Sequence, residues 1–236
     1  MDMSSIISIN DFSYFQYKNL VDKCIEQNDT REVTLQGDVV KHFINKLCAN
    51  LDIADVSYKG PVGTQTNYHD YLQYCGTYKD NNKDKATTPD LVIAQNWNWH
   101  NIQNKVDYCA VVEVKSFTIQ PIYTIGYSSY NDELRKQLER HLSAKKNKKV
   151  ILTDCLKWEF YDNNEGVIPL KTISLIDIGK DNKYPNWKWK KEKEVQVENE
   201  VIKGIFKNSI KYKEEPKEFK ELKMYLVEFL GYECEV

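Results

Sequence analysis

The most informative segment of this chain for its fold runs from Thr87 to Phe117 and has the sequence TTPDLVIAQNWNWHNIQNKVDYCAVVEVKSF. It predicts two apolar strands joined by a polar loop. The apolar run AVV favours a strand that is covered on both faces, as in the interior of an α/β sheet. Three charged residues interrupt this pattern, because Asp90 opens the first strand while Glu113 and Lys115 lie inside or at the end of the second.

Strand geometry predicts that these three charged side chains meet. Side chains alternate along a strand, so Glu113 and Lys115 project to one face while Val112 and Val114 project to the other. If the two strands form a hairpin, the start of the first lies beside the end of the second, and Asp90 then approaches both. Buried charges need partners to offset their desolvation. We therefore expect two carboxylates and one amine to converge.

This constellation predicts a metal-dependent reaction at phosphate. Two carboxylates at close range repel each other unless a cation lies between them. Oxygen ligands suit Mg²⁺ or Mn²⁺, which take the rest of their shell from water and substrate phosphate. Lys115 can orient a nucleophile or neutralise developing negative charge, which indicates phosphodiester hydrolysis. The alternatives are a turn residue after Pro89 for Asp90, and a simple ion pair on a half-exposed strand for Glu113 and Lys115.

The rest of the chain predicts an α/β layer structure around this strand pair. Apolar residues at helical spacing predict helices before and after it, and short apolar runs joined around Asp154 predict two further strands. A polar, charged segment after residue 180 ends in an amphipathic stretch. The predicted helices cover residues 11–27, 35–51, 128–144 and 217–233.

Composition indicates an ordinary globular protein. The chain has 236 residues, of which 41% are apolar and 29% charged, without any apolar run of membrane-spanning length. Its six cysteines are scattered, which favours reduced thiols in a cytoplasmic protein. The net charge of −2 excludes a general polyanion binder, yet seven basic residues and one glutamate lie between Arg135 and Lys149. Such a region can bind phosphate, or it can be a solvated helix face.

The succession of motifs resembles the PD-(D/E)xK nuclease superfamily over about Leu35 to Tyr161. Pro89-Asp90 followed by Glu113-Val114-Lys115 matches the superfamily motif, and the helix QGDVVKHFINKL is similar to its first helix. The segment QLERH, from Gln137 to His141, resembles the QxxxY helix of restriction nucleases. The strand pair VILTDCLKWEFY is similar to the one that closes the nuclease domain of type I restriction subunits, with Asp-Cys in place of Asn-Gly.

The resemblance implies a role for each matching residue. Asp90 and Glu113 would bind the metal together with the backbone carbonyl of Val114, Lys115 would be the catalytic lysine, and Gln137 would contact the substrate or help to place the lysine. Gln36 occupies the position where the first helix commonly has a glutamate, and Asp38 and Glu32 are the nearby acids. The basic region would bind nucleic acid through Arg135, Arg140, His141, Lys145 and Lys146.

The sequence thus predicts a restriction-endonuclease-like core at residues 1–180, with a central mixed sheet of about four strands flanked by helices. Residues 181–236 would form a C-terminal extension that could pack on this core. The expected function is a Mg²⁺- or Mn²⁺-dependent endonuclease acting on DNA, most simply duplex DNA cut by a homodimer, in restriction or mobile-element defence. The alternatives are a catalytically silent member that binds nucleic acid or protein, and a nuclease for RNA or branched DNA.

Overall fold

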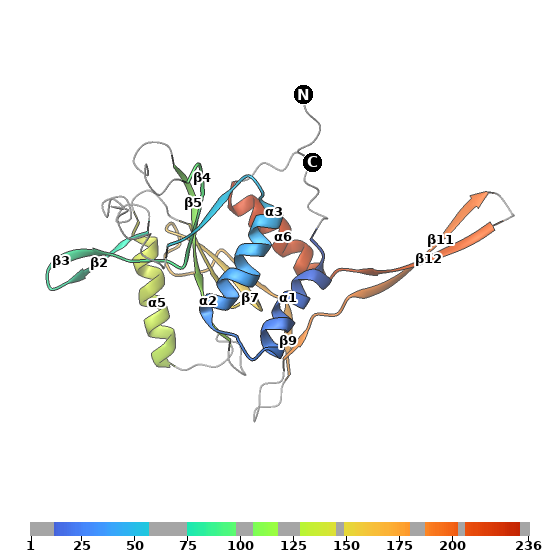
Figure 1. Ribbon diagram of the computed structural model, residues 1–236, viewed down its shortest axis with the longest axis horizontal. Coiled ribbons are helices and arrows are strands. Elements are labelled where there is room, and N and C mark those ends of the chain that lie inside the picture. The colour runs from blue at the N-terminus through green and yellow to red at the C-terminus, as the bar shows by residue number, and fades with distance from the viewer. Residues whose placement is uncertain are drawn as a thin grey trace.

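A mixed sheet of six strands forms the centre of the molecule, with the strand order β1-β4-β5-β6-β7-β8 (Figure 1). Strands β5 and β6 are parallel, and every other neighbouring pair is antiparallel. The computed structural model describes residues 12–56, 75–97, 106–117, 128–144, 149–179, 187–202 and 206–231. The strands of this sheet are β1 (Asp52–Asp55), β4 (Leu91–Gln95), β5 (Asp107–Val114), β6 (Lys149–Thr153), β7 (Lys157–Asp162) and β8 (Lys171–Ser174).

The predicted α/β class with a mixed central sheet is confirmed, but the expected number of strands was too small. The four inner strands β4 to β7 are the ones that the apolar runs predict. The structure adds β1 and β8 at the two edges, each only four residues long. Strands this short and polar carry little periodic signal, which is why the sequence pattern does not reveal them.

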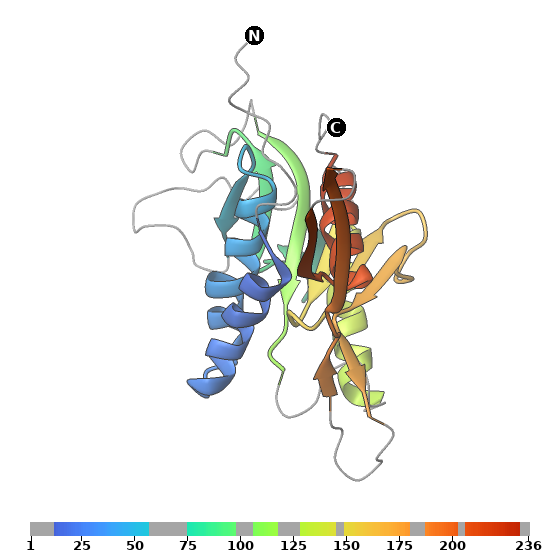
Figure 2. The ribbon, with the colours of Figure 1, turned by 90° about the vertical axis from the view of Figure 1, so that its right-hand side faces the viewer.

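Helices cover both faces of the sheet. One face packs against α1 (Tyr14–Glu26), α3 (His42–Leu47) and α6 (Lys217–Phe229), and the opposite face packs against α5 (Ser128–Leu142) (Figure 1). Short helix α2 (Glu32–Thr34) runs through a π-helical turn, η2 (Leu35–Lys41), into α3. Figure 2 shows these N-terminal helices as one layer beside the sheet.

The alternation of strand β5 divides the core into two clusters, as the sequence predicts. Val112 and Val114 belong to the cluster beneath α1, α3 and α6, whereas Val111 belongs to the cluster beneath α5. Each of these valines is at most 1% exposed. Burying such a side chain contributes about 1.5–3 kcal/mol, so the register of β5 is strongly determined and the acidic Glu113 is committed to the side of α5.

The C-terminal region contributes to the core. Helix α6 places Phe219 in ring contact with Tyr14, Tyr17 and Phe43 of the N-terminal helices. Strand β10 (Trp187–Trp189) pairs with β9 (Ile176–Ile178), which joins segments on either side of residue 180. The predicted closing helix is therefore present and packs on the core, as the sequence allowed.

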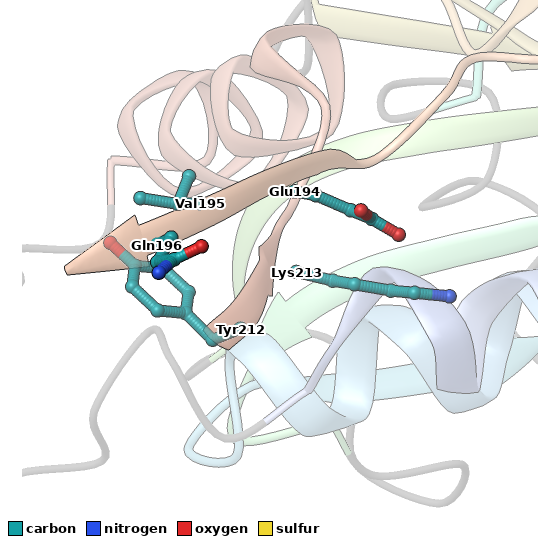
Figure 3. A pocket seen from close by; sticks show the side chains of 5 residues that line it. All are labelled: Glu194, Val195, Gln196, Tyr212 and Lys213. Carbon is teal, nitrogen blue, oxygen red and sulfur yellow. The ribbon is translucent and has the colours of Figure 1, made fainter. Parts of the chain in front are cut away.

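Two hairpins extend away from the central sheet (Figure 1). The first pairs β2 (Thr77–Asp80) with β3 (Lys83–Ala86), and the second pairs β11 (Lys193–Ile202) with β12 (Phe206–Glu214). Near the base of the second hairpin, Glu194, Val195, Gln196, Tyr212 and Lys213 line a pocket (Figure 3). Among the described helices, none has the length and apolar character needed to cross a bilayer.

Candidate active site

Asp90 lies where the sequence predicts, at the start of β4 and beside the end of β5. Its N–H donates to Val112 O at 3.1 Å, and its Oδ2 accepts from the N–H of Val114 at 2.7 Å. The antiparallel register pairs Leu91 with Val112, which brings the residue before β4 next to Glu113. The expected hairpin thus brings the two carboxylates to the same end of the sheet.

Glu113 is the centre of a buried polar cluster and is only 2% exposed. Its Oε1 accepts from Lys115 Nζ and from Gln137 Nε2, the latter at 2.5 Å. Its Oε2 faces His141 Nε2 at 3.2 Å. A carboxylate offers about four lone-pair positions, so these three contacts leave about one, on Oε2.

Lys115 is 8% exposed, and its Nζ joins two acids. Besides the hydrogen bond to Glu113, Nζ lies 3.9 Å from Oε1 of Glu32, at the start of α2. Its main-chain N–H donates to Thr153 O at 2.9 Å, which ties the lysine to the neighbouring strand β6. Sheet pairing therefore holds the main chain of Lys115, and its amine lies between the carboxylates of Glu113 and Glu32.

Burial and charge act in opposite directions on the pKa values of this pair. Burial alone would raise the pKa of Glu113, but the hydrogen bond from His141 and the charge of Lys115 outweigh it and lower this pKa. Burial alone would lower the pKa of Lys115, but attraction to Glu113, Glu32 and Asp90 outweighs it and raises this pKa. Both groups are therefore charged at neutral pH.

Asp90 behaves differently, because its carboxylate has no cationic partner of comparable strength. Burial, followed by repulsion from Glu113, raises the pKa of Asp90 to about 7. The hydrogen bond from Val114 and the charge of Lys115 only partly offset these effects. A cation beside Asp90 would relieve both the desolvation and the repulsion.

The acid that approaches the site from the N-terminal helices is Glu32. Gln36 is buried and its Nε2 donates to the main-chain O of Asp90 at 3.2 Å, so it supports the backbone at the start of β4. Asp38 is exposed, and its charge contributes to raising the pKa of the Cys24 thiol in α1. Of these three residues, Glu32 is the one with a recorded contact to Lys115.

Among the described side chains of helix α5, two contact the cluster, and the charged residues between 132 and 140 are exposed. Gln137 and His141 are four positions apart, so they share one face of the helix, and both contact Glu113. His141 was expected on the nucleic-acid-binding surface, but it is 1% exposed and part of the interior. Arg135 and Arg140 are exposed. Lys145 and Lys146 lie outside the described residues.

The spacing of Gln137 and His141 was the signal that could have placed this histidine in the site. Residues four apart on a helix lie one above the other. Once Gln137 is directed toward Glu113, His141 must face the same region. The approach of Cys75, whose main-chain O accepts from His141 Nδ1 at 3.0 Å, has no comparable signal in the sequence.

The donor chemistry fits a divalent cation, although the ligand set is partial. Asp90 and Glu113 offer carboxylate oxygens, which Mg²⁺ and Mn²⁺ prefer, and Mg²⁺ in proteins is commonly held by only one or two carboxylates. The carbonyl of Val114 belongs to the same strand end. Across the described residues, no group of three or more His, Cys, Asp or Glu side chains forms a ready metal site.

Comparisons with known proteins identify no relative. No family model matches the chain, and no curated protein and no solved structure is significantly similar to it.

Proposed function

We propose that this protein is a divalent-metal-dependent phosphodiesterase that cleaves DNA as an endonuclease of the PD-(D/E)xK type. The observation that carries the proposal is the meeting of Asp90, Glu113 and Lys115 at one end of the sheet, with Lys115 hydrogen-bonded to Glu113. Burial and repulsion from Glu113, which raise the pKa of Asp90 to about 7, agree with it. A half-buried carboxylate with a raised pKa beside a second carboxylate and an amine is an arrangement that is common in active sites.

Each residue of the site has a separate role in this proposal. Asp90 and Glu113 would hold the ion, with the carbonyl of Val114 as a further ligand. Bound there, Mg²⁺ or Mn²⁺ would neutralise charge on the phosphodiester and acidify the attacking water. Lys115 donates toward oxygen, so its amine can stabilise negative charge that develops on the phosphate. Gln137 fixes the Glu113 carboxylate from α5.

Glu32 completes the acidic surroundings of the lysine in this proposal. Its charge acts on both Asp90 and Lys115. Its side chain is 45% exposed, which leaves it free to turn toward an ion or a water at the site. Gln36 and Asp38 are less suitable, because Gln36 donates to the main-chain O of Asp90 and Asp38 is exposed and acts on the thiol of Cys24 in α1.

Duplex DNA is the proposed substrate because exposed basic residues lie on the helix that carries Gln137. Arg135 and Arg140 provide positive charge on α5, close in sequence to the residues that contact Glu113. Contacts of arginine with phosphate give affinity without sequence preference. One active site cuts one strand, so a double-strand cut would need a homodimer, which light scattering of the active protein would detect.

The test is a cleavage assay with purified protein on single-stranded, duplex and branched DNA and on RNA, each with Mg²⁺, with Mn²⁺ and with EDTA. Cleavage of duplex DNA that requires the metal and is lost in Asp90→Asn and Lys115→Met is the expected result. The Arg135→Gln and Arg140→Gln variants should retain chemistry on short substrates while binding DNA more weakly and with a smaller salt dependence. Absence of cleavage on all substrates would refute the proposal.

A second candidate function is a catalytically silent protein that uses the same fold to bind nucleic acid or a protein partner. The observation that favours it is that protein donors already occupy three of the lone-pair positions of Glu113. A silent binder would bind DNA equally with and without metal, and the Asp90→Asn variant would bind as the wild type does. An enzyme would show metal-dependent cleavage that the same substitution removes.

A further inference from the structure

His141 connects Glu113 to a distant main-chain carbonyl. The imidazole is 1% exposed, with Nε2 at 3.2 Å from Glu113 Oε2 and Nδ1 at 3.0 Å from Cys75 O. Cys75 and Glu113 come from different segments, one preceding the β2–β3 hairpin and the other within the central sheet. A buried ring with a polar partner at each nitrogen has a single orientation available to it.

The chemistry of the two partners fixes where the hydrogens lie. A carbonyl oxygen only accepts, so Nδ1 donates to Cys75 O. A hydrogen must also lie between Nε2 and Oε2, because two bare acceptors at that distance would repel each other. The Cys75 carbonyl therefore holds the ring at Nδ1, and the ring in turn holds Oε2 of Glu113 at Nε2.

The Cys75 carbonyl is itself firmly placed against the last turn of α5. Gly76 has φ +89°, and a Cβ built on it would lie 1.8 Å from Arg140 O and 3.1 Å from the Cα of His141. Only glycine allows such an approach. The N–H of Thr87 donates to Gly76 O at 3.0 Å and closes the base of the β2–β3 hairpin on this contact.

We propose that His141 is a positioning residue for Glu113, and that its bond to Oε2 sets the carboxylate orientation in which the remaining lone pair can bind a divalent cation. This inference rests on the proposed function. Lys115 and Gln137 both act on Oε1, so His141 is the described group that restrains Oε2. Groups that orient metal ligands in this way commonly change metal affinity by about 10–100-fold when removed.

Replacing His141 with asparagine or with glutamine tests the two hydrogen bonds of the ring one at a time. The amide nitrogen of asparagine occupies roughly the place of Nδ1, and that of glutamine occupies roughly the place of Nε2. His141→Asn therefore keeps the donor to Cys75 and loses the donor to Glu113, whereas His141→Gln does the reverse. If His141 only filled space in the core, both substitutions would change the Mn²⁺ affinity by a similar factor.

The experiment measures Mn²⁺ affinity by electron paramagnetic resonance for the full-length wild type and both variants, with thermal unfolding as the check on folding. We expect His141→Gln to stay within about threefold of the wild type and His141→Asn to bind Mn²⁺ about 10–100-fold more weakly. Equal affinities for the two variants, whether both reduced or both unchanged, would overturn the inference.

A measurement on the wild type keeps the test independent of variant folding. Titration with Mg²⁺, followed by ¹⁵N resonances of the histidine rings, should shift Nε2 of His141 along a saturable curve. A ring that stays unshifted while Mg²⁺ binds would contradict the inference and leave the proposed function standing. A wild-type protein that binds neither ion would overturn both. If the wild type binds the metal but cleaves no substrate, and His141→Asn weakens that binding, only the proposed function would be refuted.

Discussion

Mn²⁺ affinity should rise with pH through the titration of Asp90. The structure raises the pKa of this carboxyl to about 7 through burial and through repulsion from Glu113. Only the ionised form can bind the cation, so the ion competes with one proton. With a pKa of about 7, Asp90 is ionised to about 9% at pH 6 and about 91% at pH 8. The apparent affinity should therefore increase about tenfold across this range, equivalent to about 1.4 kcal/mol.

Isothermal titration calorimetry with Mn²⁺ in two buffers of different ionisation enthalpy measures both the affinity and the proton released. About 0.9 proton per ion should be released at pH 6 and about 0.1 at pH 8. The matched control is Asp154→Asn, because burial raises the pKa of Asp154 to about 6, outside the proposed ligand set. This substitution should leave the pH dependence intact. An affinity that is flat between pH 6 and 8, or a pH dependence that vanishes with Asp154, would refute the reasoning.

Three further predictions concern single side chains. Lys115→Met should abolish cleavage yet maintain or tighten Mn²⁺ binding, because it frees a lone pair on Glu113 Oε1; a folded variant that no longer binds Mn²⁺ would contradict the proposed division of roles. Gly76→Ala should lower the free energy of unfolding by about 2 kcal/mol or more, because of its positive φ and the 1.8 Å approach to Arg140 O. Gly37→Ala, whose new Cβ would meet no atom within 4 Å beyond its neighbours in the helix, should instead stabilise the protein by about 0.5–1 kcal/mol in urea unfolding; equal changes in unfolding free energy for the two variants would show that the close approach does not matter. Asp154→Asn should stabilise the protein by about 1–3 kcal/mol more at pH 8 than at pH 4. The reason is that the raised folded-state pKa of Asp154 lowers the stability of the wild type as pH rises from about 4 to about 6. Urea unfolding of both proteins at both pH values would refute this if the difference between variant and wild type were the same at pH 4 and pH 8.

The environment of Asp154 explains why its charge is costly. Its Oδ1 accepts from the N–H groups of Leu156 and Lys157, at 3.0 and 2.8 Å. Its Oδ2 is buried and has no hydrogen-bond partner in the described part of the chain. Asparagine retains the acceptor that shapes the turn and removes the buried charge.

The sequence predicted the central hairpin well because two independent constraints coincide there. The alternation of Val112 and Val114 with Glu113 fixes which face each side chain takes, and an antiparallel pair joins the start of one strand to the end of the next. Asp90 and Glu113 could therefore be brought together without coordinates. Helices α1, α5 and α6 were also expected, because their apolar residues recur at helical spacing.

The features that the sequence did not predict depend on contacts between segments that are far apart in the chain. Whether Glu32, Gln36 or Asp38 faces Lys115 depends on the rotation of the α2–α3 segment, which includes the π-helical turn η2. The surface assigned to His141 was incorrect because the carbonyl of Cys75, 66 residues away, provides a partner for its ring in the interior. No local pattern predicts such a pairing.

The most direct test of the metal site is anomalous X-ray scattering from a crystal of the wild-type protein soaked in Mn²⁺ at a concentration that supports DNA cleavage. We predict a Mn²⁺ peak bonded to carboxylate oxygens of both Asp90 and Glu113. A peak at neither residue, with Lys115 and Gln137 still bound to Oε1 and His141 to Oε2 of Glu113, would contradict the account.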